Sequence, residues 1–148
     1  MGNARDNIRT TTGLAHELRP VVMRLARRLR QMQDDSLGLT PSQLSAMAVL
    51  LNSGDLLMGE LAAQEKVQPP SMTRIVNSLE AGGYVARQPD PRDHRQCLVA
   101  LTDSGREVLL ANRRRRDQWL AVRLAELDPA DREILRHAVR VLDKVNRA

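Results

Sequence analysis

Short polar side chains share one side of the segment from residue 70 to residue 81, which is predicted to be helical. Arginine can pair bidentately with guanine, and serine, threonine and asparagine can reach other groups in the DNA major groove. A helix that presents such groups together is a candidate for reading base edges. The candidate base-reading residues are Pro70, Ser71, Thr73, Arg74, Asn77 and Ser78.

The opposite side of this segment is apolar. Its four apolar residues recur at i, i+3, i+4 and i+7, and they are Met72, Ile75, Val76 and Leu79. This spacing is typical of one face of an α-helix that packs on a core. The polar side is therefore expected to face outward. The glycine pair at 82–83 predicts where the helix ends.

A loop with several charged residues follows the candidate helix, between two extended runs at 84–87 and 97–101. These runs are expected to pair as an antiparallel hairpin, which makes the loop a wing. The Pro- and Asp-rich loop is also compatible with an ordinary solvated turn. Its position directly after the candidate helix favours a role in binding. The candidate wing residues are Arg92, Asp93, His94 and Arg95.

Two further helices are expected before the base-reading segment. Thr40 and Gln43 can form the two halves of a capping box, for a helix that runs to Gly54. A short helix over 60–66 follows, and Pro69 opens the next helix three residues later. Two short helices joined so tightly are the signature of a helix-turn-helix.

Amphipathic helices are predicted at both ends of the chain. Apolar residues repeat at helical spacing from Leu14 to Met32, and Pro20 within this run is expected to kink the helix. Two more helices, beginning near residues 103 and 129, complete the chain. No other segment is left to cover their apolar faces, so these faces are expected to pack on a second copy. The candidate dimerisation residues are Leu14, Leu18, Leu135, Val139, Leu142 and Val145.

The chain length of 148 residues, 42% of them apolar, suits one continuous domain. The expected fold is mainly α with a small β-hairpin wing. It is a winged helix-turn-helix over 39–102, flanked by an N-terminal dimerisation helix over 1–38 and C-terminal dimerisation helices over 103–148.

The charge distribution gives only limited support for nucleic-acid binding. The net charge is +5, but residues 41–101 carry −1, so the prediction rests on individual positions. No nucleophile with a nearby base, no phosphate-binding glycine loop and no metal-ligand spacing occurs, so neither enzymatic activity nor a cofactor or metal is expected. The lone Cys97, expected to be a small buried hydrophobe, and the absence of a long apolar run predict a cytoplasmic protein with no membrane association.

Six motifs occur in an order that resembles the MarR family of bacterial transcription regulators, and together they span nearly the whole chain. They are residues 39–43, Glu60-Leu61-Ala62, residues 70–76, the run from Leu79 to Val85, the run from Asp90 to Arg95, and the run from Leu101 to Gly105. The resemblance implies a homodimeric repressor on a palindromic DNA operator. It also implies release by a small effector, in many members an aromatic or phenolic anion, at a pocket whose residues do not transfer from the family.

The resemblance also assigns roles within the wing. Arg95 would enter the minor groove, and Asp93 would hold its guanidinium in position, while Arg92 and His94 would lie near phosphates. Two departures from the family pattern are Leu57 and Gln68, where a polar N-cap is usual. Each loss costs about 1 kcal/mol of local helix stability.

Two alternatives remain open at the level of sequence. A winged helix can also serve as a protein-interaction module, or bind DNA without any effector. Specific binding to the DNA upstream of its gene would exclude the interaction module.

Overall fold

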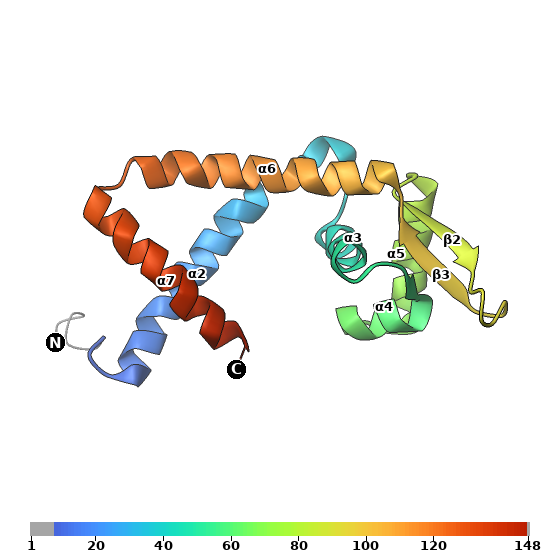
Figure 1. Cartoon of the computed structure of the whole chain (residues 1–148), viewed down its shortest axis with the longest axis horizontal. Coiled ribbons are helices and arrows are strands. Elements are labelled where there is room, and N and C mark those ends of the chain that lie inside the picture. Colours follow the sequence, from blue (N-terminus) through green and yellow to red (C-terminus); the bar gives the residue numbers. More distant parts are fainter. Residues whose placement is uncertain (1–7, 148) are drawn as a thin grey trace. The chain divides into compact units, whose positions relative to one another are not determined.

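The computed structural model describes residues 8–147, which group into two compact units. One unit comprises residues 34–113, and the other joins the chain before residue 34 to the chain after residue 113. Figure 1 labels their elements.

The unit over residues 34–113 contains three helices and a small sheet. The 3-10 turn η1 (Asp35–Leu37) leads into α3 (Pro41–Ser53), α4 (Met58–Glu65) and α5 (Pro69–Ala81). The strands are β1 (Leu56–Leu57), β2 (Val85–Pro89) and β3 (Cys97–Leu101), and α6 (Asp103–Ala125) begins in this unit. The predicted helices and hairpin are thereby confirmed, with α4 beginning two residues earlier than expected.

The sheet has three antiparallel strands in the order β1-β3-β2. β2 and β3 form the expected hairpin, in which Val85 pairs with Leu101 and Arg87 pairs with Val99. The sequence did not predict β1, whose Leu56 pairs with Val99 on the other edge of β3. A run of two residues is too short to show strand alternation, so only the neighbouring β3 makes it a strand.

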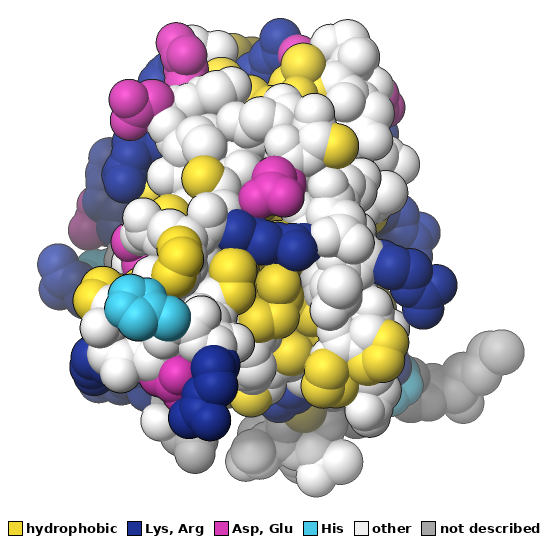
Figure 2. Space-filling view, turned by 90° about the vertical axis from the view of Figure 1, so that its right-hand side faces the viewer, with side chains coloured by type: hydrophobic (Ala, Val, Ile, Leu, Met, Phe, Trp, Pro, Cys, Tyr) yellow, Lys and Arg dark blue, Asp and Glu magenta, His cyan; other side chains and the backbone are white. Residues whose placement is uncertain are grey.

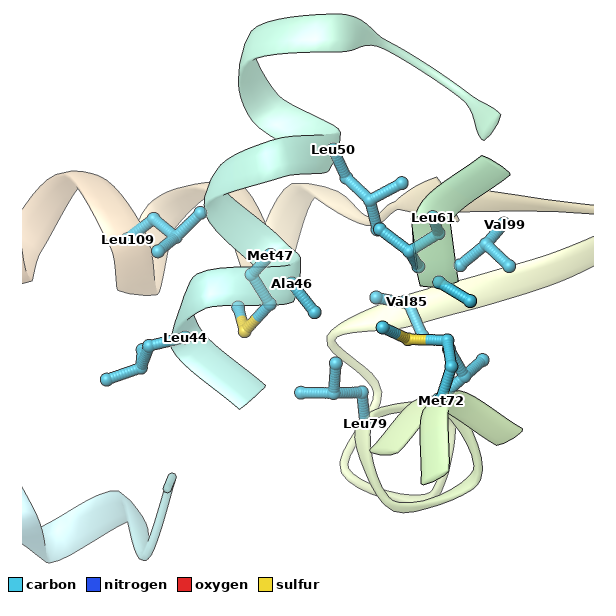
Figure 3. Packing of buried hydrophobic residues seen from close by; sticks show 12 residues of the cluster. Leu44, Ala46, Met47, Leu50, Leu61, Met72, Leu79, Val85, Val99 and Leu109 are labelled. Carbon is cyan, nitrogen blue, oxygen red and sulfur yellow. The ribbon is translucent and has the colours of Figure 1, made fainter. Parts of the chain in front are cut away.

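The core of this unit lies where α3, α4 and α5 meet the sheet and the start of α6 (Figure 3). From α5, Met72, Val76 and Leu79 are fully buried, as the apolar spacing predicts. Each fully buried side chain of this size contributes roughly 1.5–3 kcal/mol. The other core residues are Leu44, Ala46, Met47, Leu50, Leu61, Ala62, Val85, Val99 and Leu109.

Side-chain caps fix where several helices begin. The predicted capping box is present: the Gln43 backbone N–H donates to the Thr40 hydroxyl, and the Thr40 N–H donates to Gln43 Oε1. The Thr102 hydroxyl accepts from the Gly105 N–H and donates to the Gly83 carbonyl, which joins the start of α6 to the turn after α5. These bonds satisfy helix-end groups that would otherwise lack partners.

The two helices without a polar N-cap differ in how they begin. Leu57 offers α4 no side-chain acceptor, but the Glu60 carboxylate accepts the Leu57 N–H at 2.9 Å, which is half of a capping box. Gln68 makes no capping bond to α5, and Pro69 occupies the first turn, where its fixed φ favours the helix.

The second unit is built from long helices. It contains α2 (Thr11–Gln31), the C-terminal half of α6, and α7 (Pro129–Arg147). Pro20 lies inside α2, as the apolar spacing from Leu14 to Met32 predicts. Trp119 of α6 is half-buried, with the guanidinium carbons of Arg28 and Arg123 at 5.9 and 5.8 Å from its ring centre. Both distances suit cation–π contacts.

None of the helices described between residues 8 and 147 combines the length and apolar composition that crossing a membrane requires.

Candidate nucleic-acid interface

The helix α5 divides cleanly into a buried and an exposed side. Of the candidate base-reading residues, Ser71 is half-buried and the others are exposed. The structure therefore brings these residues to one accessible face. They are Pro70, Ser71, Thr73, Arg74, Asn77 and Ser78.

Arg74 is the free cation of this face. Among residues 8–147, no carboxylate or other hydrogen-bond partner holds its guanidinium. An unpaired, exposed guanidinium keeps all five of its donors for a partner outside the chain. Its geometry allows a bidentate contact with guanine or a contact with a phosphate.

Three of the other candidates are already engaged within the unit. The Thr73 hydroxyl donates to the Pro69 carbonyl one turn earlier, at 3.0 Å. The Asn77 amide oxygen accepts from the Arg87 guanidinium, and the Ser78 hydroxyl accepts from Gln43 Nε2 at 2.8 Å. The polar side of α5 is thus partly organised by neighbouring elements before any ligand is present.

The wing loop is folded by its own aspartates. Asp90 is buried, and its carboxylate accepts the Arg92 N–H at 3.0 Å while its own N–H donates to the Gln96 carbonyl. The Asp93 carboxylate accepts the Arg95 N–H at 3.1 Å. Aspartate side chains that accept an N–H two residues later form turns of this kind.

Asp93 and Arg95 also interact through their side chains. Arg95 Nε lies 3.1 Å from Asp93 Oδ1, and the Arg95 side chain is 91% exposed. The side-chain bond from Arg95, followed by the backbone bond from Arg95 and the bond from Gln96, lowers the pKa of Asp93. The pair therefore holds an exposed guanidinium at the wing, next to the exposed side chains of Arg92 and His94.

Cys97 begins β3 beside this loop and is half-buried rather than fully buried, because it lies at the end of the hairpin. Among the described residues, no group of three His, Cys, Asp or Glu side chains could hold a metal ion.

The exposed face at the wing side of this unit has no continuous basic surface. In Figure 2, its Lys and Arg side chains are separated by apolar and uncharged side chains. This agrees with the net charge of −1 over residues 41–101. Single, positioned cations are therefore the features that could attract a polyanion here.

Sequence reasoning did not assign three residues that organise the site. The sequence indicates Gln43 as a cap but not as a partner of Ser78, it places Asp90 only within a motif, and it indicates no contact for Arg87. Their partners lie in other segments, except for Asp90. The spacing Asp90-x-Arg92 is the one local signal that could have been found.

The geometry defines a class of protein: a helix-turn-helix formed by α4 and α5, with an adjoining β-hairpin wing, is a winged helix-turn-helix. A model of the MarR family matches residues 37–96. An HTH-type transcriptional regulator of Mycobacterium tuberculosis is 49% identical over 125 residues, which cover 84% of this chain and 87% of the relative.

Two more comparisons agree. The HTH-type transcriptional repressor MdtR of Bacillus subtilis is 35% identical over 80 residues, or 52% of each protein. The structure of a MarR family protein from Bacillus stearothermophilus is similar, with a TM-score of 0.77 and 26% identity, and the match covers 96% of this chain and 99% of that one. The chain belongs to the MarR family of winged-helix transcription regulators. Proteins of this kind are regulators and not enzymes, as the sequence predicted.

Proposed function

We propose that this protein is a homodimeric repressor that binds a palindromic operator, with α5 in the major groove and the wing in the minor groove. The observation that carries the proposal is that two accessible guanidinium groups lie on neighbouring elements. Arg74 on α5 has no partner among the described residues, and Arg95 is held by Asp93 at the wing. One suits a base edge and the other suits a narrow groove.

The homodimer is proposed because the unit built from α2, α7 and the end of α6 has almost no core of its own. No residue of α7 is buried, although this helix has a strongly apolar side. Two hollows in this unit have mainly apolar linings, one with Leu18 and Leu142 and the other with Leu135 and Val139. The proposed dimer seam contains Leu14, Leu18, Leu135, Val139, Leu142 and Val145, all at least 36% exposed.

A second copy is the occupant that fits these surfaces. An amphipathic helix is stable when its apolar side is covered, and large apolar side chains exposed along helix faces favour an interface. Two identical copies related by a twofold axis cover each other with the same residues. The same axis explains the proposed operator symmetry, because it would present two α5 helices to two inverted half-sites.

Repression and effector release complete the proposal. A dimer that occupies promoter DNA blocks access to it, and the relative MdtR is a repressor. We propose that a small aromatic or phenolic anion favours a protomer arrangement that fits the operator less well. Such a ligand can only act through its different affinity for the two arrangements.

A gel-shift titration tests DNA binding. The full chain is mixed with labelled DNA from the region upstream of its gene, and unlabelled upstream or unrelated DNA is added as competitor. We expect only the upstream DNA to compete at low excess, and a reporter behind this region to be expressed more strongly when the protein is absent. Equal competition by both DNAs would contradict a specific operator, and no shift at all would favour a protein-interaction module.

A further inference from the structure

The contact between Arg87 and Asn77 determines which way the Asn77 amide is turned. Arg87 lies on β2, and its guanidinium donates to the side chain of Asn77 on α5. A guanidinium has donors and no acceptor, so the amide atom that it contacts must be the oxygen. The amide nitrogen of Asn77 makes no hydrogen bond within residues 8–147.

Arg87 is itself held in place from two sides. Its backbone N–H donates to the Glu80 carboxylate of α5 at 3.2 Å, and its position on β2 is fixed by pairing with Val99. The side chain is half-buried, and its Nε atom is inaccessible to water. The backbone of Arg87 is thus anchored, and among the described residues its half-buried guanidinium has Asn77 as its hydrogen-bond partner. A guanidinium on such a fixed backbone serves better to hold this neighbour than to reach a distant phosphate.

We propose that Arg87 is a specificity-determining residue that fixes Asn77 as a hydrogen-bond donor toward DNA. This inference rests on the proposed function, in which α5 lies in the major groove. A free asparagine pairs with adenine by using its oxygen and nitrogen together, on N6 and N7. With its oxygen turned to Arg87, Asn77 presents its nitrogen. The bases that match best are guanine through O6 or N7 and thymine through O4. Adenine also has an acceptor at N7, but its N6 donor would then lack the asparagine oxygen as a partner.

Ser78 is also prepared as a hydrogen-bond donor, through a different contact. Gln43 is only 9% exposed, and its amide oxygen is occupied by the Thr40 N–H. Its nitrogen therefore faces Ser78, whose hydroxyl oxygen accepts the bond at 2.8 Å. The Ser78 proton remains available for an acceptor outside the chain. Two neighbouring positions of α5 are thus prepared as donors by residues behind them.

The test selects binding sites from a randomised duplex library with the full chain and with two variants, Asn77→Ala and Arg87→Met. Methionine retains an apolar stem of similar length but cannot donate. The position read by Asn77 is the one whose base preference disappears in Asn77→Ala. We expect guanine or thymine there with the natural chain. With Arg87→Met, we expect adenine to gain about tenfold relative to that base, the size of one good bidentate contact.

The double variant Arg87→Met/Asn77→Ala separates positioning from a general effect. If Arg87 acts through Asn77, the base preferences of the double variant should equal those of Asn77→Ala alone. Arg92→Ala serves as the matched control, since loss of an exposed wing cation should weaken binding to all sequences alike.

Three outcomes would overturn the inference. Adenine at the Asn77 position in the natural chain would do so even if Arg87→Met did not fold. Unchanged preferences in a folded Arg87→Met would do so as well, as would a uniform loss of affinity for all sequences. Failure of the natural chain to select any motif would instead overturn the proposed function.

Discussion

At the scale of single residues, the candidate site depends on where guanidinium groups are held. Within residues 8–147, Arg74 has no side-chain partner and Arg95 is oriented by a carboxylate, while Arg87 donates to Asn77. Three arginines of the same charge therefore differ in their side-chain partners. Their differences come from the acceptors around them and not from bulk charge.

Replacing Asp93 by alanine should weaken operator binding. On charge alone, removal of an acid near DNA should strengthen binding, but loss of Asp93 frees the guanidinium that it orients. Arg95→Ala should lower the affinity for the operator, and it should make this affinity less dependent on salt concentration. The measurement is a set of salt titrations of the two single variants and the double variant. A double variant no weaker than Arg95→Ala supports coupling, and tighter binding by Asp93→Ala would show that no such coupling exists.

The same pair has a defined pH dependence. Because Arg95 lowers the pKa of Asp93, the carboxylate is charged at and above the ordinary aspartate value of about 3.9. The contribution of the pair is complete above this value and is lost as the pH falls through the lowered pKa. The ratio of operator affinities of the natural chain and Asp93→Ala should therefore stay constant from pH 8 to pH 5. A ratio that changes across this range would contradict the assignment.

Arg74→Ala should relax base preference. The free guanidinium of Arg74 faces away from the core, and loss of a bidentate guanine contact costs about 1–3 kcal/mol. Affinities for operator and for random DNA are compared at one salt concentration. Equal losses on the two DNAs would assign Arg74 to a phosphate instead.

At the scale of elements, close packing joins the start of α6 to the turn after α5. A Cβ atom on Gly105 would lie 2.1 Å from the Tyr84 carbonyl oxygen, so this position requires glycine. Gly83 has a φ of 78°, in the left-handed region that favours glycine. These two glycines thus allow the start of α6 to pack closely against the turn after α5.

Gly105→Ala should therefore lower the free energy of unfolding by about 1–3 kcal/mol, because the neighbouring backbone must shift. Gly59→Ala in α4 is the matched control, since nothing lies within 4 Å of its added Cβ. That change should stabilise by up to roughly 0.5–1 kcal/mol through helix propensity. Urea unfolding at one protomer concentration measures both. Similar values for the two variants would show that the close approach does not matter.

At the scale of the whole molecule, the two units differ in how complete they are. The unit over residues 34–113 has a buried core of its own, whereas α7 contributes no buried residue to the other unit. If the second copy supplies the missing cover, dimer formation and operator binding must be lost together.

Replacing Leu135 and Val139 by glutamate should abolish both dimer formation and operator binding. Each change would place an unpaired charge in the proposed seam, at a cost of several kcal/mol. Arg140→Glu, on the polar side of α7, should leave the dimer intact. Sedimentation gives the mass and gel shift gives DNA binding. An unchanged dimer mass in the double glutamate variant would show that the seam lies elsewhere.

The sequence by itself determined the elements whose signals are local. The apolar spacing of α5 and the Thr40–Gln43 capping box depend on residues a few positions apart, and the two extended runs of the wing follow each other across one loop. Each of these features is present. Only the tertiary structure decided that Leu56 and Leu57 form a strand, that Arg87 holds Asn77 and that Gln43 holds Ser78. These contacts join segments separated by 10 to 43 residues. No local pattern encodes such a contact, because it exists only once the core has fixed the distance between the two segments.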